Sequence, residues 1–375
     1  MVRGMHKFAV SVLAVIAGAA AINAGAQSAS KTLFVMTNAA TRNEVIAFRQ
    51  SADGHFYEAG RYDTHGRGSG GITDPLQSQG SLTLSRDHTL LFAANAGSGT
   101  VSVFRVFRSS LSLVDQIPSG GSEPLSIAQF ENTVYVLNSA GSGSIVAFRL
   151  RADGHLQQIE NSTTFLTASN SGGSSLSISP SGKILAVTER VPNNIDTFQI
   201  NPDGTLASIV INKSSAPGVF DAAFAPDGSL IVSETGPTGG VDASAISSYT
   251  IQANGELAAV SQSVPTFGQA NCWNAIAPNG KWAYVSNAGS STISGFSIGQ
   301  GGTLTAIVGT VVGSNPEGST NLDIAVSGDS KYVFTLNSSS GTIGVFAIQS
   351  NGGLGNVEEI SGLPQSVGMN GIAAL

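Results

Sequence analysis

At 375 residues, the chain is long enough for one large domain or two ordinary ones, and its net charge of −7 comes with only 11% charged residues. An acidic balance without clusters of Lys or Arg argues against a nucleic-acid partner and against an anionic membrane surface, because both need basic patches. The 46 glycines, with Ser, Thr and Asn between short apolar runs, are typical of an all-β protein with many tight turns.

The first 26 residues have the pattern of a secretory signal peptide. Three basic residues precede an apolar segment, 8–21, which is too short to span a bilayer, and Ala24 and Ala26 form an A-x-A cleavage site. We therefore predict an exported protein, periplasmic or extracellular, whose mature part, 27–375, is one domain that does not insert into a membrane. An uncleaved anchor is the alternative.

Seven copies of one pattern occupy the rest of the chain. Each copy has an apolar run that ends in Asn or Glu, a turn of small residues, and then Val or Ile followed three positions later by an aromatic residue. The apolar runs end at Asn38, Asn95, Asn138, Glu189, Glu234, Asn287 and Asn337, and the aromatic residues are Phe48, Phe104, Phe148, Phe198, Tyr249, Phe296 and Phe346. A repeat of about 50 residues with several short strands predicts a seven-bladed β-propeller.

Each repeat divides into four antiparallel strands, a to d. A Pro-Asp-Gly type of turn joins the short strand a to the apolar strand b, and an Asp-Gly or Asn-Gly hairpin joins strand c to strand d. The spacing of three on strand c places the Val or Ile and the aromatic residue on opposite faces, one toward each neighbouring blade. The mature chain opens with strand b of the first repeat and ends with a lone strand a, 371–375. We therefore predict that the last residues complete the first blade and close the ring.

Several runs carry a family resemblance. The segments TVYVLN (133–138), WAYVSN (282–287) and AGSSTISGF (288–296) resemble YVTN-type repeats. Over residues 31–375 the chain resembles the bacterial seven-bladed propeller lactonases, a family that includes a 6-phosphogluconolactonase and is related to fungal carboxymuconate lactonizing enzymes. The resemblance implies hydrolysis of a lactone.

One departure from that family limits the comparison. Such lactonases often have a His just before strand a, whereas the corresponding pairs here are Ser174-Ser175, Phe220-Asp221, Cys272-Trp273 and Asn321-Leu322. The histidine-dependent chemistry of the family therefore does not transfer to these positions.

The b–c loops and the connections from strand d to the next strand a share one face of a propeller, here called the connection face. The Asn residues that end strand b are expected to cap the b–c turns through hydrogen bonds to the backbone. Adjacent repeats have Glu189 and Glu234 instead, and the two carboxylates are expected to approach each other at the channel mouth. One would act as general base on water, and the other as acid or as partner of Arg190, which would hold a carboxylate or lactone oxygen. A structural ion-pair network between two blades is the alternative.

Further candidates lie in the connections. His65, in the long segment 61–80, is the one histidine of the mature chain expected on the connection face, as a catalytic residue or a spectator. Trp273 is expected to stack on a sugar or, alternatively, to pack between blades. The candidate substrate-binding residues, all at the start of strand a, are Asp221, Trp273, Asn274 and Asp323.

No cofactor is predicted. The Glu, Asp and Asn oxygens of the channel mouth would suit Ca²⁺, but the sequence has no contiguous ligand loop. We expect an exported, monomeric, lactonase-like hydrolase of a non-phosphorylated sugar lactone or related cyclic ester. The alternative is a non-catalytic propeller that binds a carbohydrate or a protein on the connection face.

Overall fold

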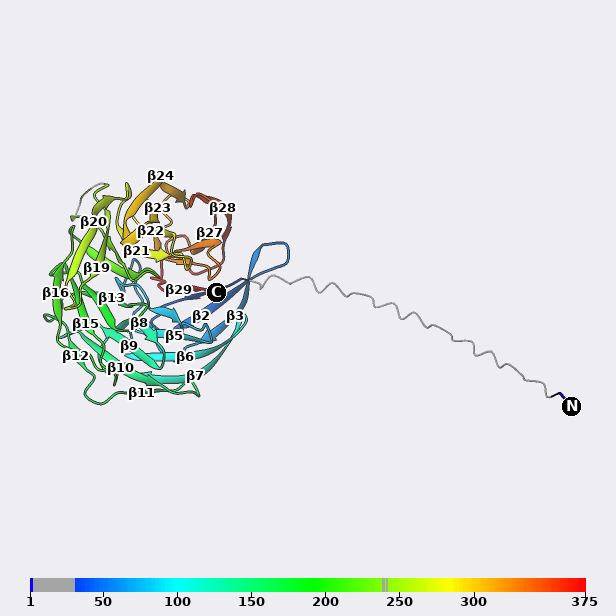
Figure 1. Cartoon of the computed structure of the whole chain (residues 1–375), viewed down its shortest axis with the longest axis horizontal. Coiled ribbons are helices and arrows are strands. Elements are labelled where there is room, and N and C mark those ends of the chain that lie inside the picture. Colours follow the sequence, from blue (N-terminus) through cyan, green and yellow to red (C-terminus); the bar gives the residue numbers. More distant parts are fainter. Residues whose placement is uncertain (3–30, 238–239, 241) are drawn as a thin grey trace. The chain divides into compact units, whose positions relative to one another are not determined.

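The computed structural model describes residues 1–2, 31–237, 240 and 242–375, and the segment Lys31–Leu375 forms one compact unit. Its strands build seven antiparallel sheets arranged as a ring, as Figure 1 shows. This confirms the predicted all-β, seven-bladed propeller. The predicted signal peptide lies outside the described residues, apart from residues 1–2. Within the described residues, no helix has the length and apolar character needed to cross a membrane.

Apart from β29, the strands of blades 1 to 4 lie within residues 32–213, and each blade is described from its inner strand a to its outer strand d. Blade 1 consists of β29 (Ile372–Ala374), β1 (Thr32–Met36), β2 (Glu44–Gln50) and β3 (Phe56–Asp63). Blade 2 consists of β4 (Leu82–Leu84), β5 (Leu90–Asn95), β6 (Thr100–Phe107) and β7 (Ser110–Pro118). Blade 3 consists of β8 (Pro124–Phe130), β9 (Thr133–Asn138), β10 (Ser144–Leu150) and an outer edge in two pieces, β11 (Leu156–Gln158) and β12 (Thr164–Phe165). Blade 4 consists of β13 (Gly173–Ile178), β14 (Ile184–Glu189), β15 (Asn194–Gln199) and β16 (Val210–Lys213).

The remaining three blades follow in chain order. Blade 5 consists of β17 (Val219–Phe224), β18 (Leu230–Glu234), β19 (Ala245–Ile251) and β20 (Leu257–Pro265). Blade 6 consists of β21 (Asn271–Ile276), β22 (Trp282–Asn287), β23 (Thr292–Ile298) and β24 (Leu304–Ser314), with a short 3-10 helix, Gln300–Gly302, before β24. Blade 7 consists of β25 (Asn321–Val326), β26 (Tyr332–Asn337), β27 (Thr342–Ile348) and β28 (Leu354–Ile360).

Apolar clusters fill the interfaces between neighbouring blades. In every blade the Val or Ile of strand c lies in the cluster shared with the next blade, and the aromatic residue lies in the cluster shared with the preceding one. On β6, for example, Val101 packs in a cluster with Val136 of blade 3, whereas Phe104 packs in a cluster with Phe34 of blade 1. The spacing of three on strand c therefore builds two interfaces from one strand, as predicted.

Hairpins between strands c and d also join neighbouring blades. The buried Tyr135 donates its hydroxyl hydrogen to the carbonyl oxygen of Gly204 in the next blade at 2.9 Å, and Tyr284 does the same to Gly352 at 2.8 Å. Arg149 donates through Nη2 to the carbonyl oxygen of Asp203 at 2.7 Å. The Asp-Gly and Asn-Gly turns thus supply acceptors for the preceding blade, in addition to reversing the chain.

The ring closes between the two ends of the described segment. Strand β29 pairs antiparallel with β1, with Leu33 opposite Ala374 and Val35 opposite Ile372. The amide of Met36 donates to the carbonyl oxygen of Gly371 at 2.9 Å. Gly371 has a φ of +102°, and a Cβ atom there would lie 2.8 Å from Cβ of Leu82, so this closing turn requires glycine. The predicted closure is confirmed.

Candidate active site

The long connection between β3 and β4 enters the centre of the ring. Its residues 78–81, here called the hub segment, bond to inner strands of several blades. Ser78 Oγ donates to the carbonyl oxygen of Leu125 at 3.0 Å, and the Gln79 amide donates to that of Ser174 at 3.1 Å. From across the ring, Trp273 Nε1 donates to the carbonyl oxygen of Ser78 at 2.8 Å. Because these partners belong to blades 3, 4 and 6, the hub segment crosses the axis of the propeller.

The side chain of Gln79 continues this crossing. Its Nε2 donates to the carbonyl oxygen of Asn274 at 2.9 Å, and its Oε1 accepts from the Asn274 amide at 3.1 Å. An amide side chain thereby pairs with the backbone of an inner strand, satisfying groups that would otherwise be buried without partners. The sequence showed a long insertion at 61–80, but nothing in it distinguished an inward path from a surface loop.

The four predicted substrate-binding residues surround the hub segment, and all are closed to solvent. Trp273 is 0% exposed, and its ring meets Phe220 edge-on with centroids 5.2 Å apart, so it packs within the protein. Burial raises the pKa of Asp221 to about 7. Burial also raises the pKa of Asp323 well above its ordinary value, and the charge of Asp221 adds to that shift. Asp221 and Asn274 are 4% and 1% exposed. Buried side chains of this kind offer no open surface to a substrate.

Four of the five Asn residues that end strand b, namely Asn38, Asn95, Asn138 and Asn337, bond to connections between blades, whereas the expected bonds from their side chains to the backbone of their own b–c turns are not among those of the described residues. Asn95 accepts through Oδ1 from Thr64 Oγ1 at 2.7 Å, and it donates through Nδ2 to Ser102 Oγ on strand c at 2.9 Å. A Cβ atom on Gly66 would lie 2.3 Å from Cγ of Asn95, so the connection must have glycine where it passes this side chain. Asn287 likewise donates to Ser294 Oγ on strand c of its own blade at 2.9 Å.

Glu189 takes the place of this Asn in blade 4. Its Oε1 accepts from the Thr167 amide at 3.0 Å and its Oε2 from Thr167 Oγ1 at 2.8 Å, and the residue is 0% exposed. Asp196 stands at the register of Ser102, and burial together with Glu189 raises the pKa of Asp196 to about 9. Burial alone would raise the pKa of Glu189, but hydrogen bonding by Asp196 and Thr167 outweighs burial and lowers that pKa. No donor reaches the oxygens of Asp196, which fits a protonated carboxyl that donates its own hydrogen to Glu189.

Glu234 plays the corresponding part in blade 5. Its Oε1 accepts from Ser214 Oγ at 2.6 Å and from the Ala216 amide at 2.8 Å, and its Oε2 accepts from Ser247 Oγ at 2.6 Å. The residue is 0% exposed, and burial raises the pKa of its carboxyl despite these hydrogen bonds. Each glutamate is thus enclosed by the connection before its own blade. In this structure the two carboxylates are not side by side in an open site.

Arg190 differs from the glutamates because it stays partly exposed. In the described part of the chain its guanidinium makes no ion pair, and its buried Nε has no hydrogen-bond partner. The guanidinium carbon lies 6.0 Å from the centroid of the Phe220 ring. Burial lowers the pKa of Arg190, while the charge of Asp74 acts to raise it. A positively charged group on the connection face, above the hub, is therefore available to a ligand.

The remaining features to place are His65, Cys272 and a possible metal site. His65 is exposed, with a φ of 57°, and its carbonyl oxygen accepts from Gln116 Nε2 at 2.9 Å. It belongs to the connection between blades 1 and 2, whereas Glu189 and Arg190 belong to blade 4. Cys272 is buried, and burial raises the pKa of its thiol. Among the described residues, no three His, Cys, Asp or Glu side chains are grouped so as to hold a metal ion.

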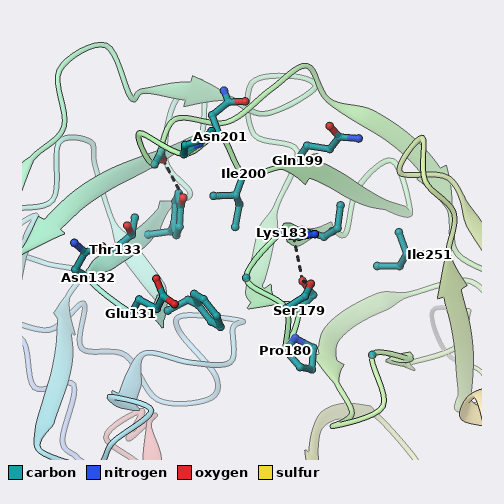
Figure 2. Close-up of a pocket in the computed structure, with 18 of the residues that line it drawn as sticks. Glu131, Asn132, Thr133, Ser179, Pro180, Lys183, Gln199, Ile200, Asn201 and Ile251 are labelled. Atoms are coloured by element: carbon teal, nitrogen blue, oxygen red, sulfur yellow. Dashed lines mark hydrogen bonds between the residues drawn. The ribbon is translucent and has the colours of Figure 1, made fainter.

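A cavity lies on the opposite face of the ring. Its volume is about 1020 Å³, and its lining comes from turns and hairpins of blades 3, 4 and 5 (Figure 2). Lys183, Gln199 and Ile251 are among its lining residues. A second cavity of about 260 Å³ includes Gln79, His88 and Asp323. The large cavity contains none of the candidate site residues, because a–b turns and c–d hairpins point away from the connection face.

Comparison with known families gives one match. The sequence profile described as "Lactonase, 7-bladed beta-propeller" matches residues 26–163, 131–272 and 244–367. No curated protein matches the chain in sequence.

Solved structures share the architecture over their whole length. A protein of unknown function from Desulfotomaculum acetoxidans DSM 771 is 14% identical, with a TM-score of 0.71, and covers 92% of this chain and 98% of its own. A protein from Bacteroides uniformis ATCC 8492, provisionally described as a 6-phosphogluconolactonase, is 18% identical, with a TM-score of 0.70, and covers 92% of this chain and 99% of its own. The periplasmic gluconolactonase PpgL of Pseudomonas aeruginosa is 18% identical, with a TM-score of 0.68, and covers 91% of this chain and 99% of its own. At this level of identity the likeness establishes the fold.

Proposed function

Since the chain belongs to the seven-bladed β-propeller lactonase family, we propose that it hydrolyses a lactone, with a sugar lactone or related cyclic ester as substrate. Two structural neighbours, one described as a gluconolactonase and one provisionally as a 6-phosphogluconolactonase, support that substrate class. Both neighbours align along nearly the entire chain, so the support extends to the whole domain.

The main support for the proposal is the partly exposed guanidinium of Arg190. A guanidinium without a carboxylate partner in the described protein, partly buried beside Phe220, is a strong donor for an oxygen of the substrate. In lactone hydrolysis the carbonyl oxygen gains negative charge as water adds to the carbonyl carbon. A fixed cationic donor at that oxygen stabilises the transition state more than the ground state.

We assign the two glutamates a positioning role. Glu189 holds the connection before blade 4 through Thr167, and it directly precedes Arg190, so its hydrogen bonds fix the backbone that carries the guanidinium. Glu234 holds the connection before blade 5 through Ser214 and Ala216, close in sequence to Phe220. Direct action of either carboxylate on water would require the covering connection to move away. His65 remains a candidate at the rim of the connection face.

We further propose that the protein acts outside the cytoplasm. The support is the signal-peptide pattern of residues 1–26 and the periplasmic neighbour from P. aeruginosa. Phosphorylated gluconolactone is an intracellular metabolite, so an exported enzyme would act on a lactone without phosphate.

A panel of lactones tests the proposal. We expect wild-type protein to open at least one sugar lactone, and Arg190→Gln to lower kcat/KM by roughly 10²–10³-fold, as loss of one oxyanion donor does. Glu189→Gln and Glu234→Gln should lower stability more than they lower the turnover of the folded fraction. Arg67→Gln, at an exposed arginine of the same face, is the matched control and should leave kcat/KM unchanged.

The outcomes separate enzyme from binding module. Turnover that a chelator abolishes would show that a metal takes part. A folded wild-type protein that opens no lactone in the panel would contradict the proposal and favour the non-catalytic propeller that binds a carbohydrate or protein.

A further inference from the structure

An aromatic ring from the neighbouring blade lies against the guanidinium of Arg190. The guanidinium carbon is 6.0 Å from the centroid of the Phe220 ring, which is the reach of a cation–π contact. Arg190 follows strand b of blade 4 and is partly exposed, whereas Phe220 lies on strand a of blade 5 and is 4% exposed. One side of the cation is therefore bordered by a ring that is closed to solvent.

The backbone of Phe220 is bound to the blade that carries Arg190. Its carbonyl oxygen accepts from Ser174 Oγ at 2.7 Å and from Thr188 Oγ1 at 2.5 Å. Thr188 lies on β14, two residues before Arg190, and Ser174 lies on the paired strand β13. The pairing of β17 with β18 is irregular at Phe220, as in a β-bulge. The position of the ring is thus defined relative to β14, and not by blade 5 alone.

The turn that follows Arg190 is bonded to the same segment of blade 5. The amide of Asn193 donates to the carbonyl oxygen of Arg190 at 3.3 Å, which closes the turn. Asn193 Oδ1 accepts from the Val219 amide at 2.9 Å, and its Nδ2 donates to the carbonyl oxygen of Ala216 at 3.0 Å. The backbones that carry the guanidinium and the Phe220 ring are therefore joined both before and after Arg190.

Two further neighbours define where the ring and the guanidinium lie. Trp273 meets Phe220 edge-on at 5.2 Å between centroids, and its Nε1 donates to the carbonyl oxygen of Ser78 in the hub segment. A Cβ atom on Gly172 would lie 3.3 Å from Nη2 of Arg190, so the guanidinium has little free space on that side. Phe220 therefore contacts both a side chain fixed at the hub segment and the guanidinium.

Hydrogen bonding of Nε does not orient this guanidinium. Among the described residues, Nε of Arg190 is buried and has no hydrogen-bond partner. The donors of a guanidinium lie in one plane, so its orientation decides which of them reach an oxygen of a ligand. The face of an aromatic ring attracts a cation, and the attraction is stronger where water is partly excluded. The ring of Phe220 is thus placed to limit the rotation of the guanidinium.

We propose that Phe220 is a positioning residue for Arg190, and that its ring holds the guanidinium in the orientation in which it donates to the carbonyl oxygen of the lactone. This inference rests on the proposed function. Without the ring, Arg190 would keep its charge but would also adopt orientations that miss the developing oxyanion. A displacement of about 1 Å from the productive geometry can lower a rate by roughly 10²-fold.

Phe220→Leu tests the inference on the lactone that wild-type protein opens. Leucine keeps an apolar side chain in the cluster that contains Trp273, but it removes the ring face. We expect kcat to fall by roughly 10–10²-fold with little change in KM, because an oxyanion donor acts mainly in the transition state. Phe224→Leu, at the other end of β17 and partly exposed, is the matched control and should keep both kcat and KM.

A double-mutant cycle separates positioning from a general loss of structure. In the Arg190→Gln background, Phe220→Leu should change kcat by less than about twofold, because no guanidinium is left to orient. A merely structural role would lower kcat by the same factor in both backgrounds. Phe220→Met nearly fills the same space and takes the place of Phe220→Leu in both backgrounds if the leucine variant does not fold.

Activities are compared per folded protein, with the folded fraction measured by near-UV circular dichroism. Equal losses of kcat in the two backgrounds, or wild-type kcat in Phe220→Leu, would overturn this inference and leave the proposed function standing. A folded wild-type protein that opens no lactone would overturn both.

Discussion

Asp196 occupies a register position at which blades 2, 5 and 6 carry serine, namely Ser102, Ser247 and Ser294. In those blades a hydroxyl meets the Asn or Glu that ends strand b. In blade 4 two carboxyls meet, and both are 0% exposed. Two buried carboxyls in contact share one proton, because ionising both would place two uncompensated charges in a medium of low polarity.

This pair makes stability depend on pH in a defined direction. Asp196 ionises near its ordinary value in the unfolded chain, whereas burial and Glu189 raise its pKa to about 9 in the folded protein. Its contribution to stability is therefore fully present below about pH 4 and is lost as the pH rises toward about 9. Asp196→Asn donates to Glu189 at every pH. We expect the variant to match the wild type near pH 4 and to exceed its free energy of unfolding by about 1–3 kcal/mol near pH 8.

Urea denaturation across that pH range measures the difference. Asp196→Val, which copies Val146 at the same register of blade 3, is the comparison, since it removes the donor and should destabilise the protein by about 1–3 kcal/mol. Parallel pH dependences for wild type and Asp196→Asn would show that the two carboxyls do not share a proton.

At the scale of elements, the connection between β3 and β4 links inner strands on different sides of the ring, because its residues 78–81 bond to blades 3, 4 and 6. Gln79 makes two hydrogen bonds to the backbone of Asn274, and both lie at the partly buried centre. Gln79→Ala should therefore lower the free energy of unfolding by about 1–3 kcal/mol. Gln77→Ala, at an exposed glutamine of the same connection, should change it by less than about 0.5 kcal/mol. Equal effects of the two substitutions on the urea midpoint would mean that the crossing adds nothing to stability.

The elements also show what the sequence could predict. Strands, hairpins and ring closure follow from apolar runs and turn residues that recur every 50 residues or so, because each blade must bury the same two faces. The path of residues 78–81 could not be predicted from the sequence. The residues Ser-Gln-Gly are typical of a surface loop, and here they lie at the centre of the ring because of hydrogen bonds to residues far away in the sequence.

The candidate site could be predicted only in part from the sequence, because it too depends on contacts between residues far apart in the chain. The replacement of Asn by Glu189 and Glu234 is visible in the repeat. Its meaning depends on Asp196 and Ser247, which reach the glutamates only in the observed strand register.

At the scale of the whole molecule, the propeller depends on one short strand from the end of the chain. β29 pairs with β1, Ile372 packs in the interface between blades 7 and 1, and Ala373 packs in the interface between blades 1 and 2. Without residues 371–375, β1 becomes an unpaired edge and two apolar clusters open to water. We expect a chain that ends at Asn370 to lose cooperative unfolding at the wild-type urea midpoint and to associate through the exposed edge.

Point substitutions in the same terminal segment separate the effect of apolar packing from the effect of shortening the chain. Ile372 is 6% exposed, so Ile372→Ala should lower the free energy of unfolding by about 2–4 kcal/mol. Val367→Ala, at a residue that is 36% exposed in the same terminal segment, should cost less than about 1 kcal/mol. Urea midpoints and sedimentation of the three variants check these expectations. If the truncated chain kept the wild-type midpoint as a monomer, the ring would be stable without closure, and the blades would have to be held by their interfaces and the hub segment alone.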